Sequence, residues 1–344
     1  MCWSRPRAAI LLAGALLSGC AVDARLRPAE YRQLGGRTFV IVGASSGFGQ
    51  GAALRLGQNH ANVVLAARRG DLLEEIAGRI RASGGQALVV PTDAGDPAAM
   101  EALGRAAMQR FGRIDVWMNI AGVGAIGRFW DIPAADQSRL IDTNLKGVVY
   151  GSRVALRQFV AQGQGTLVNM GSVESVIPIA YHASYAATKA GVLSLGRAIN
   201  QELRQAGKGG TIRVATVMPY AADTPFFDHA ANYSGHTGRM ILMDHPSKIV
   251  DALMWVSLHP REELPVGWKA QAATSAHGFL PDLTEHVAAD IQLREMRKGA
   301  ALPATTGAVH APMAAGRTEE GGVKCRAQAE DAARLRGGAG DRPQ

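Results

Sequence analysis

The feature that most constrains the fold is a glycine-rich turn between an apolar strand and a helix. Residues 38–42, Thr-Phe-Val-Ile-Val, are apolar and β-branched, and they lead directly into Gly43-Ala-Ser-Ser-Gly47-Phe-Gly49 and a helical stretch. Such glycines let the backbone approach a pyrophosphate closely, and the amide groups at the helix start attract the same group. Alone the cluster is a weak signal, because 41 glycines make an ordinary turn a real alternative. With supporting motifs, it predicts a dinucleotide-binding unit.

The next predicted strand, residues 62–67, ends in Arg68 and Arg69. A dinucleotide-binding unit carries an acidic residue for the adenosine ribose at about this place. Guanidinium groups suit a 2′-phosphate through bidentate contacts instead, so the sequence favours NADP over NAD. The alternative is a pair of solvated arginines that opens the next helix. The net charge of +8 is compatible with an anionic cofactor but identifies neither site nor partner.

A second motif, Tyr185-Ala-Ala-Thr-Lys189, places a phenol and an ammonium on one helix face at i and i+4. The ammonium favours the ionised phenol, so we expect the pKa of Tyr185 to fall from about 10 toward neutral pH. Ser172 lies upstream at the end of an apolar run. Together the three residues predict acid/base chemistry. Each alone has a local alternative, such as a strand-end cap for Ser172 or a solvated helix position for Lys189.

These motifs occur in an order that resembles the short-chain dehydrogenase/reductase family over residues 35 to 260. Gly43-x-x-x-Gly47-x-Gly49 is similar to the family's cofactor loop, and Asn119-Ile-Ala-Gly122 resembles its Asn-Asn-Ala-Gly element. The resemblance implies a catalytic tetrad of Asn144, Ser172, Tyr185 and Lys189. The cofactor-binding residues expected are Gly43, Ser45, Ser46, Gly47, Phe48, Gly49, Arg68, Arg69, Asp93, Asn119, Ala121, Gly122, Tyr185, Lys189, Pro219 and Thr224.

The resemblance also implies roles for these residues. The nicotinamide exchanges a hydride with a carbonyl carbon while Tyr185 exchanges the proton, and Ser172 holds the same oxygen. Lys189 acts on the Tyr185 pKa and on the nicotinamide ribose, and Asn144 anchors a water that leads to solvent. Asp93 contacts the adenine. Pro219 and Thr224 resemble a Pro-Gly-x-x-x-Thr segment near the nicotinamide.

Two tyrosines bear on this interpretation. Tyr220 replaces the glycine that usually follows the proline, so its side chain either crowds the nicotinamide pocket or lines the substrate cleft, and it puts the Thr224 contact in question. Tyr181 is rejected as the acid/base because no lysine follows it at i+4. Beyond residue 220, several large apolar residues either line a substrate pocket or pack the core. They are Phe226, Phe227, Tyr233, Met240 and Met243.

Alternating apolar strands and helical patterns predict an α/β fold, a doubly wound parallel sheet of the Rossmann type in a single domain with a C-terminal extension. We expect strands at 38–42, 62–67, 87–90, 114–118, 165–170 and 211–218. Residues 261–300 have helical character and apolar residues that suit packing on the core or near a membrane. Residues 301–344 are rich in Ala, Gly, Pro, Thr and charge, so we expect a disordered tail.

The N-terminus resembles a bacterial lipoprotein signal. Arg5 and Arg7 precede the apolar run 8–17, and Leu-Ser-Gly-Cys20 follows. We therefore expect residues 1–20 to be a signal or anchor segment, with membrane attachment through a lipid on Cys20. The alternative is a chance apolar leader on a cytoplasmic enzyme, because several arginines follow and NADP is a cytoplasmic cofactor.

The sequence thus predicts an NADP(H)-dependent oxidoreductase that interconverts a small-molecule carbonyl and a secondary alcohol, acting as a homo-oligomer. The alternative is a catalytically idle nucleotide-binding sensor or scaffold at the membrane. No groove-reading motif or basic cluster indicates nucleic-acid binding despite the basic pI. No metal-ligand spacing occurs among the nine histidines and three cysteines, so we expect no metal.

Overall fold

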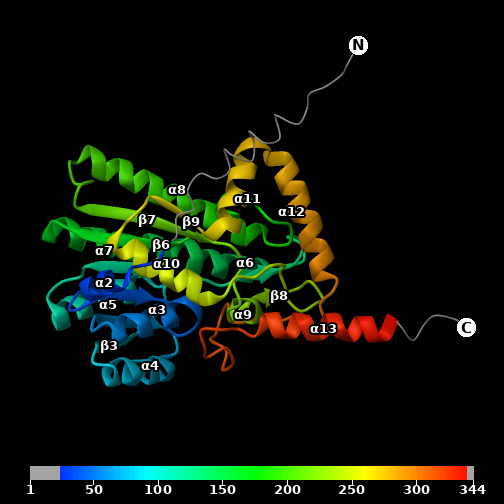
Figure 1. Cartoon of the computed structure of the whole chain (residues 1–344), viewed down its shortest axis with the longest axis horizontal. Helices are drawn as coiled ribbons and strands as arrows, with labels where there is room; N and C mark the ends of the chain where they lie inside the picture. The colour runs from blue at the N-terminus through cyan, green and yellow to red at the C-terminus, as the bar shows by residue number, and fades with distance from the viewer. Residues whose placement is uncertain (1–23, 339–344) are drawn as a thin grey trace, which may run out of the picture.

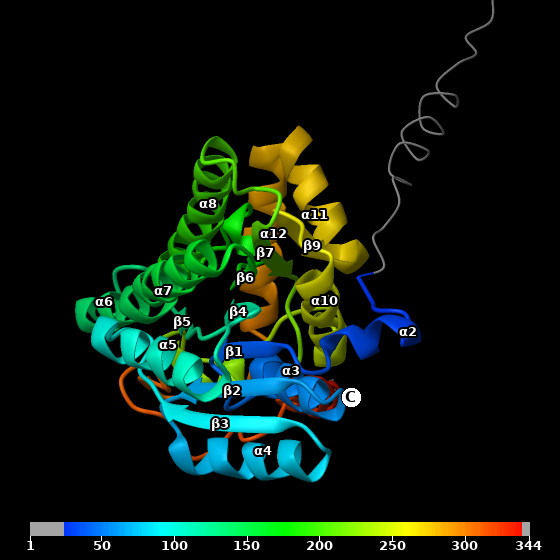
Figure 2. The same ribbon diagram turned by 90° about the vertical axis from the view of Figure 1, so that its left-hand side faces the viewer.

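The computed structural model describes residues 24–338 and consists of a central parallel sheet covered by helices on both faces (Figure 1). Every pairing in the seven-stranded sheet is parallel, and the strand order is β3-β2-β1-β4-β6-β7-β9. Figure 2 shows the strands in this order, with β3 at the bottom. The strands are β1 Thr38–Val42, β2 Asn62–Ala67, β3 Gln86–Pro91, β4 Val116–Asn119, β6 Gly165–Met170, β7 Ile212–Pro219 and β9 Glu263–Val266. The predicted Rossmann-type fold is confirmed.

The strands form where the sequence offers apolar, mostly β-branched runs without alternation. All five residues of β1 are buried, as expected for a strand with helices on both faces. The predicted bounds of β1, β2 and β6 match the observed ones, and those of β3, β4 and β7 differ by one or two residues at their ends. The seventh strand, β9, was not predicted; its short Glu-Leu-Pro-Val sequence buries only Leu264 and Val266 at the sheet edge.

Two sets of helices cover the faces of the sheet, and each contributes an apolar cluster. On one face lie α3 Gly47–Gln58, α4 Gly70–Ala82 and α10 Pro246–Leu258. On the other lie α5 Pro97–Phe111, α7 Gly147–Gln162 and α8 Ala183–Gln205. Figure 2 shows α5, α7 and α8 together on one side and α3 and α10 on the other. The strand order reverses direction between β1 and β4, where ligands bind in doubly wound sheets, at the carboxyl ends of the strands.

Shorter elements connect this framework. A two-stranded parallel pair joins β5 Ala125–Ile126 to β8 Ala231–Asn232. The remaining elements are α2 Pro28–Tyr31, η1 Arg32–Leu34, α6 Ala134–Ile141, the π-helical turn η2 Asp142–Lys146, η3 Val173–Ser175, α9 Phe226–His229, α11 Gly267–Phe279, α12 Pro281–Met296 and α13 Val323–Gly338. Helices α11 and α12 occupy the segment expected to be helical and pack against each other (Figure 1).

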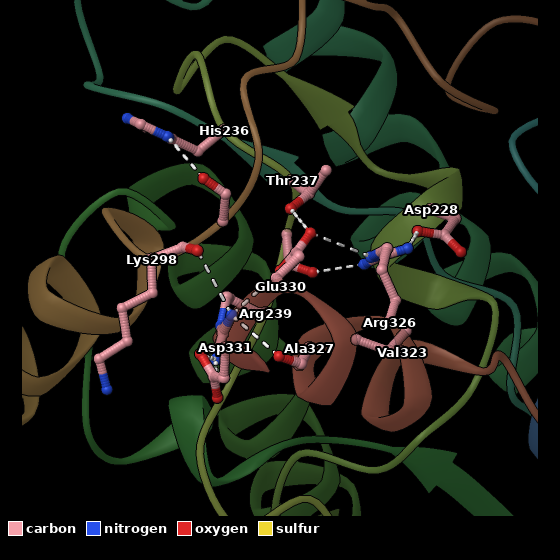
Figure 3. Close-up of polar contacts among 12 residues, drawn as sticks. Asp228, His236, Thr237, Arg239, Lys298, Val323, Arg326, Ala327, Glu330 and Asp331 are labelled. Atoms are coloured by element: carbon pink, nitrogen blue, oxygen red, sulfur yellow. Dashed lines mark hydrogen bonds and ion pairs between the residues drawn. The ribbon is translucent and has the colours of Figure 1, made fainter. Parts of the chain in front are cut away.

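The C-terminal segment corrects the expectation of a disordered tail, because residues 301–338 follow a defined path on the body. Val309 and Val323 are fully buried, each within an apolar cluster. Arg239, which is 4% exposed, forms ion pairs with Glu295 on α12 and with Glu330 and Asp331 on α13 (Figure 3). The composition of this segment offers few apolar side chains to bury, which is why disorder was expected. Two buried valines and the ion pairs of Arg239 nevertheless hold the segment on the body.

The predicted signal segment, residues 1–20 with Cys20, lies outside the described residues. Among residues 24–338, no helix is long and apolar enough to cross a membrane.

Candidate active site

The glycine turn after β1 is built on close backbone contacts. Gly43 has a φ of 97°, and a Cβ added there would lie 2.5 Å from the Ala121 amide nitrogen. A Cβ on Gly49 would lie 2.1 Å from the Gly43 carbonyl oxygen. Side chains at these positions would push apart the turn, the start of α3 and the loop after β4. The glycines therefore bring the start of α3 against the strand ends, the cradle in which a dinucleotide phosphate binds.

Most of the predicted site residues come together around one cavity at the carboxyl ends of the strands. Gly49, Asn119 and Asn144 do not line it. The predicted residues that line it are Gly43, Ser45, Ser46, Gly47, Phe48, Arg68, Arg69, Asp93, Ala121, Gly122, Ser172, Tyr185, Lys189, Pro219 and Thr224.

The predicted acid/base trio lies at one end of this cavity. Ser172 follows β6 and caps η3, where its hydroxyl accepts a hydrogen bond from the Glu174 amide at 3.1 Å. Tyr185 and Lys189 are one turn apart on α8, and the Lys189 ammonium lies 5.5 Å from the centre of the Tyr185 ring. The ammonium donates a hydrogen bond to the Met170 carbonyl at 2.7 Å. The geometry thus joins the trio to the end of β6.

The protonation of Tyr185 differs from the sequence expectation. Desolvation and the carboxylate of Glu174 raise the pKa of Tyr185, and the hydrogen bond to Ser172 only partly opposes them. Burial also lowers the pKa of Lys189, to about 8, so this ammonium loses its proton more readily than that of an exposed lysine. The prediction of a lowered Tyr185 pKa counted the ammonium on the same helix face, but it could not include desolvation or Glu174. The site therefore favours a neutral phenol that can donate a proton.

Asn144 and Asn119 support the site from behind. Asn144 lies in the π-helical turn η2, and its side chain accepts from the Val123 amide and donates to the Val123 carbonyl, both at 2.8 Å. Asn119 accepts from the Trp117 indole at 2.8 Å and donates to Asn169 at 2.9 Å. Both asparagines are buried. Asn144 thus holds the loop after β4 and Asn119 joins β4 to β6, and neither lines the cavity.

The predicted cofactor arginines follow β2 and lie beside the glycine turn. Arg69 donates to the Ser45 hydroxyl at 3.1 Å and to its carbonyl at 3.2 Å. Both guanidinium groups also donate to main-chain carbonyls of residues 308–316. Asp93 pairs with Arg139 and accepts from the Gly95 amide at 2.9 Å. The residues expected around the adenosine end thus lie together, with the C-terminal segment against them.

Tyr220 lines the cavity, but it does not displace Thr224, which also lines it. A Cβ on Gly47 would lie 3.6 Å from Thr224 Cβ, so the threonine stays next to the glycine turn. The Lys269 ammonium lies over the Tyr220 ring, 5.5 Å from its centre. The rejected Tyr181 has a φ of 69° and does not line the cavity.

The large apolar residues after 220 divide between two roles. Phe226, Phe227 and Met240 line the cavity, and the Phe226 ring lies 5.3 Å from that of Tyr185. Met243 packs in an apolar cluster, whereas Tyr233 donates a hydrogen bond of 2.5 Å to Asp136. Both alternatives left open by the sequence therefore occur, at different residues.

Several residues that line the cavity were not predicted from the sequence. Glu174 and His182 line it beside Ser172 and Tyr185, and residues 308–313 border its cofactor end. A charged residue inside the apolar stretch Val-Glu-Ser-Val-Ile-Pro was a signal that could have identified Glu174. No local signal pointed to residues 308–313, because their partners lie about 240 positions away in the sequence.

Comparison with known proteins agrees with this geometry. Residues 37–233 match the family model described as short chain dehydrogenase. The chain is 30% identical to the uncharacterized oxidoreductase YxnA of Bacillus subtilis, over 75% of this chain and 73% of that protein. It is 34% identical to 3beta-hydroxysteroid dehydrogenase 1 of Eggerthella lenta, over 66% of this chain and 88% of that protein.

Solved structures show the same similarity. A metagenomic short-chain oxidoreductase in complex with NADP is 28% identical, with a TM-score of 0.57 over 67% of this chain and 96% of that one. An alcohol dehydrogenase from the archaeon Thermococcus sibiricus, complexed with 5-hydroxy-NADP, is 26% identical, with a TM-score of 0.57 over 66% of this chain and 94% of that one.

The fold, the glycine turn and these matches define an oxidoreductase with a nicotinamide cofactor. The chain belongs to the short-chain dehydrogenase family and is an oxidoreductase that acts on CH–OH donors.

Proposed function

We propose that the protein interconverts a carbonyl and a secondary alcohol with NADP(H) and that Tyr185 is the acid/base. The observation that carries the proposal is one shared cavity, which Ser172, Tyr185 and Lys189 line together with the glycine turn and Arg69. Similarity to a hydroxysteroid dehydrogenase supports a secondary alcohol as one of the two reacting forms.

The chain's own residues perform the proton chemistry. A bound nicotinamide supplies or accepts the hydride. Tyr185, kept neutral by its surroundings, donates its phenolic proton to the oxygen that develops negative charge during reduction. Ser172 donates a hydrogen bond to the same oxygen and stabilises its charge. Lys189 is held at the end of β6 by the Met170 carbonyl, and Asn144 fixes Val123 on the opposite wall.

Selectivity for NADP over NAD is part of the proposal. Arg69 bonds Ser45 of the glycine turn, and Arg68 and Arg69 both line the cavity, which supports the binding of a 2′-phosphate by these guanidinium groups. The test is the affinity of the protein for NADPH and NADH in the wild type and in an Arg68→Ala, Arg69→Ala variant. We expect the variant to lose NADPH affinity by about 10- to 100-fold and NADH affinity by much less. Equal losses for both cofactors would refute the assignment.

Two further expectations from the sequence remain proposals. We propose a lipid on Cys20 and membrane attachment; incorporation of labelled palmitate in cells, lost in Cys20→Ser, would support it, and unlabelled soluble protein would refute it. We also propose a homo-oligomer. Exposed apolar residues on the α11–α12 hairpin, such as Phe279 at 84% exposure, support association with a second copy. Light scattering of the purified protein measures the oligomeric state, and a monomer would contradict the proposal.

A further inference from the structure

Two buried polar side chains at the substrate end of the cavity each have an unpaired atom. Glu174 and His182 are 8% and 6% exposed, and Glu174 Oε1 lies 3.0 Å from His182 Nδ1. Within the described part of the chain, Glu174 Oε2 and His182 Nε2 have no hydrogen-bond partner. Buried polar atoms are nearly always paired, so two free ones in the same place indicate a group that arrives from outside.

These two side chains lie at the reacting end of the cavity. Both line it, and the Glu174 amide donates to the Ser172 hydroxyl at 3.1 Å. The His182 ring lies 6.4 Å from the Tyr185 ring at an interplanar angle of 80°. A substrate whose carbonyl meets Ser172 and Tyr185 therefore has Glu174 and His182 next to its neighbouring atoms.

The charge state of the pair follows from its surroundings. Burial lowers the pKa of His182, but the charge and hydrogen bond of Glu174 outweigh it, so the net shift is upward. Glu174 therefore favours the protonated form of His182, in which the free Nε2 is an N–H donor, and Glu174 Oε2 is a free hydrogen-bond acceptor.

We propose that Glu174 and His182 form a subsite for a hydroxyl group of the substrate, which makes the substrate a hydroxylated ketone or aldehyde. This inference rests on the proposed function. A hydroxyl can pair with either atom, as an acceptor from Nε2–H or as a donor to Oε2. An apolar group leaves both unpaired. Phe226 and Met240 provide the apolar wall for the carbon skeleton.

The test compares NADPH-dependent reduction of 2-hydroxycyclohexanone and cyclohexanone by the full chain. We expect kcat/KM to be about 10- to 100-fold higher for the hydroxyketone, because only the hydroxyketone offers a hydroxyl to one of the buried unpaired atoms. Glu174→Ala should remove most of this advantage by slowing the hydroxyketone alone. Glu202→Ala, on the exposed face of α8, is the matched control.

Equal kcat/KM for the two ketones in the wild type would refute the subsite while leaving the proposed function intact. An equal loss with both ketones in Glu174→Ala would also refute it, because that would indicate a structural role. If NADPH binds and no ketone in a broad panel is reduced, the proposed function fails and the subsite fails with it.

A second, independent observation concerns residues 308–318, which we call the C-terminal strap. Arg68 donates to the carbonyls of Ala308 at 2.6 Å and His310 at 3.1 Å. Arg69 donates to the carbonyls of Ala315 and Gly316, both at 3.2 Å. The amide of Gly47, at the start of α3, donates to the Thr318 carbonyl at 3.0 Å. The strap thus places neutral carbonyl oxygens on the donors that the proposed function reserves for phosphate.

The strap is held by anchors on both sides. Val309 packs in the cluster around Val123 and Leu140, and His310 lies 2.8 Å from Asp136. Beyond the strap, Val323 is buried, its amide donates to Asp223 at 2.7 Å, and Arg239 binds the carboxylates of α13 (Figure 3). Figure 3 shows Arg239 and Arg326 on opposite sides of Glu330, so α13 is fixed to the loop that contains residues 237–239.

We infer that the strap competes with the 2′-phosphate for Arg68 and Arg69 and so reduces the preference for NADPH over NADH. This inference also rests on the proposed function. A phosphate forms stronger, charge-assisted hydrogen bonds than a carbonyl, so NADPH displaces the strap at the arginines. The apparent affinity for NADPH is then the intrinsic affinity multiplied by the fraction of molecules in which the strap is released. NADH has no 2′-phosphate and competes with the strap only at the Gly47 amide, so its affinity falls less.

The test uses full-length variants of two apolar residues on α13. Val323→Asp places a charge in a buried position and should release the strap, whereas Leu335→Asp changes a side chain that is 78% exposed and is the control. We expect Val323→Asp to bind NADPH at least about fivefold more tightly, with NADH changed by less than about twofold. Faster trypsin cleavage after Arg317 reports strap release, and thermal unfolding shows that the core remains folded.

Arg239→Met, which removes the ion pairs of α13, provides a second route to the same state. Unchanged or weaker NADPH binding in a folded variant with a released strap would overturn the inference, as would an equal gain for NADH. If neither cofactor binds to wild type or variants, the proposed function fails, and the strap has no phosphate to compete with.

Discussion

Gly49→Ala tests whether the glycine turn is a close-packed cradle. The added Cβ would lie 2.1 Å from the Gly43 carbonyl oxygen, whereas ordinary contact begins at 3.4 Å, so about 1.3 Å must open between strand and helix. Both partners are backbone, and neither can rotate away. We expect a loss of about 1–3 kcal/mol in the free energy of unfolding, the usual range for overpacking. Displacement of the α3 start should also weaken NADPH binding by at least about tenfold.

Urea unfolding followed by tryptophan fluorescence measures the free energy of unfolding, and NADPH titration measures the affinity for the cofactor. The matched control is Gly78→Ala, within α4, where an added Cβ meets nothing within 4 Å. There the substitution should stabilise the protein by about 0.5–1 kcal/mol, because Ala loses less backbone entropy in a helix. Gly49→Ala with wild-type stability and wild-type NADPH affinity would refute the reasoning, because the clash would then be relieved without cost.

Three further predictions concern the cavity. Because the pKa of Tyr185 is raised above its ordinary value, the phenol stays protonated at neutral pH and above. Alcohol oxidation, which needs the phenolate, should therefore rise about tenfold per pH unit from pH 7, while carbonyl reduction keeps its acid. An oxidation rate that levels off below pH 8 would contradict the upward pKa shift. Asn144→Ala removes both hydrogen bonds to Val123 and should lower the free energy of unfolding, measured in urea, by about 2–4 kcal/mol. A change under about 0.5 kcal/mol would show that Asn144 does not stabilise the loop. Tyr220→Gly should increase kcat/KM for bulky ketones, because Tyr220 lines the cavity. The NADPH dissociation constant should stay within about threefold, because Thr224 keeps its place beside Gly47. A large loss of NADPH affinity would show that Tyr220 contributes to cofactor binding.

The sequence predicted those parts of the molecule that depend on local patterns. The strand-turn-helix at Gly43 follows from neighbouring residues, and the apolar runs of β1, β2 and β6 identify buried parallel strands. The spacing of Tyr185 and Lys189 places both on one face of α8. The family resemblance grouped Ser172 with these two residues, and in the structure all three line one cavity.

The sequence did not predict the features that depend on distant contacts. The strap touches Arg68 and Arg69 across about 240 residues. The composition of residues 301–344 indicated disorder, and in the described part of that segment only Val309 and Val323 have fully buried side chains. The sign of the Tyr185 pKa shift depends on desolvation and on Glu174, which spacing along a helix does not reveal. Asn119 and Asn144 carry the residue types expected of the family, but their bonds point into the protein.

The most direct test of the central claim is single-turnover hydride transfer in Tyr185→Phe with bound NADPH and a reducible hydroxyketone. Because the substitution removes only the phenolic hydroxyl, we expect the NADPH dissociation constant to stay within about threefold and turnover to fall by at least about 1,000-fold. That result supports an enzyme in which Tyr185 supplies the proton. Turnover within about tenfold of wild type would contradict the acid/base assignment, and wild-type protein that binds NADPH but reduces no carbonyl would favour the idle nucleotide-binding sensor instead.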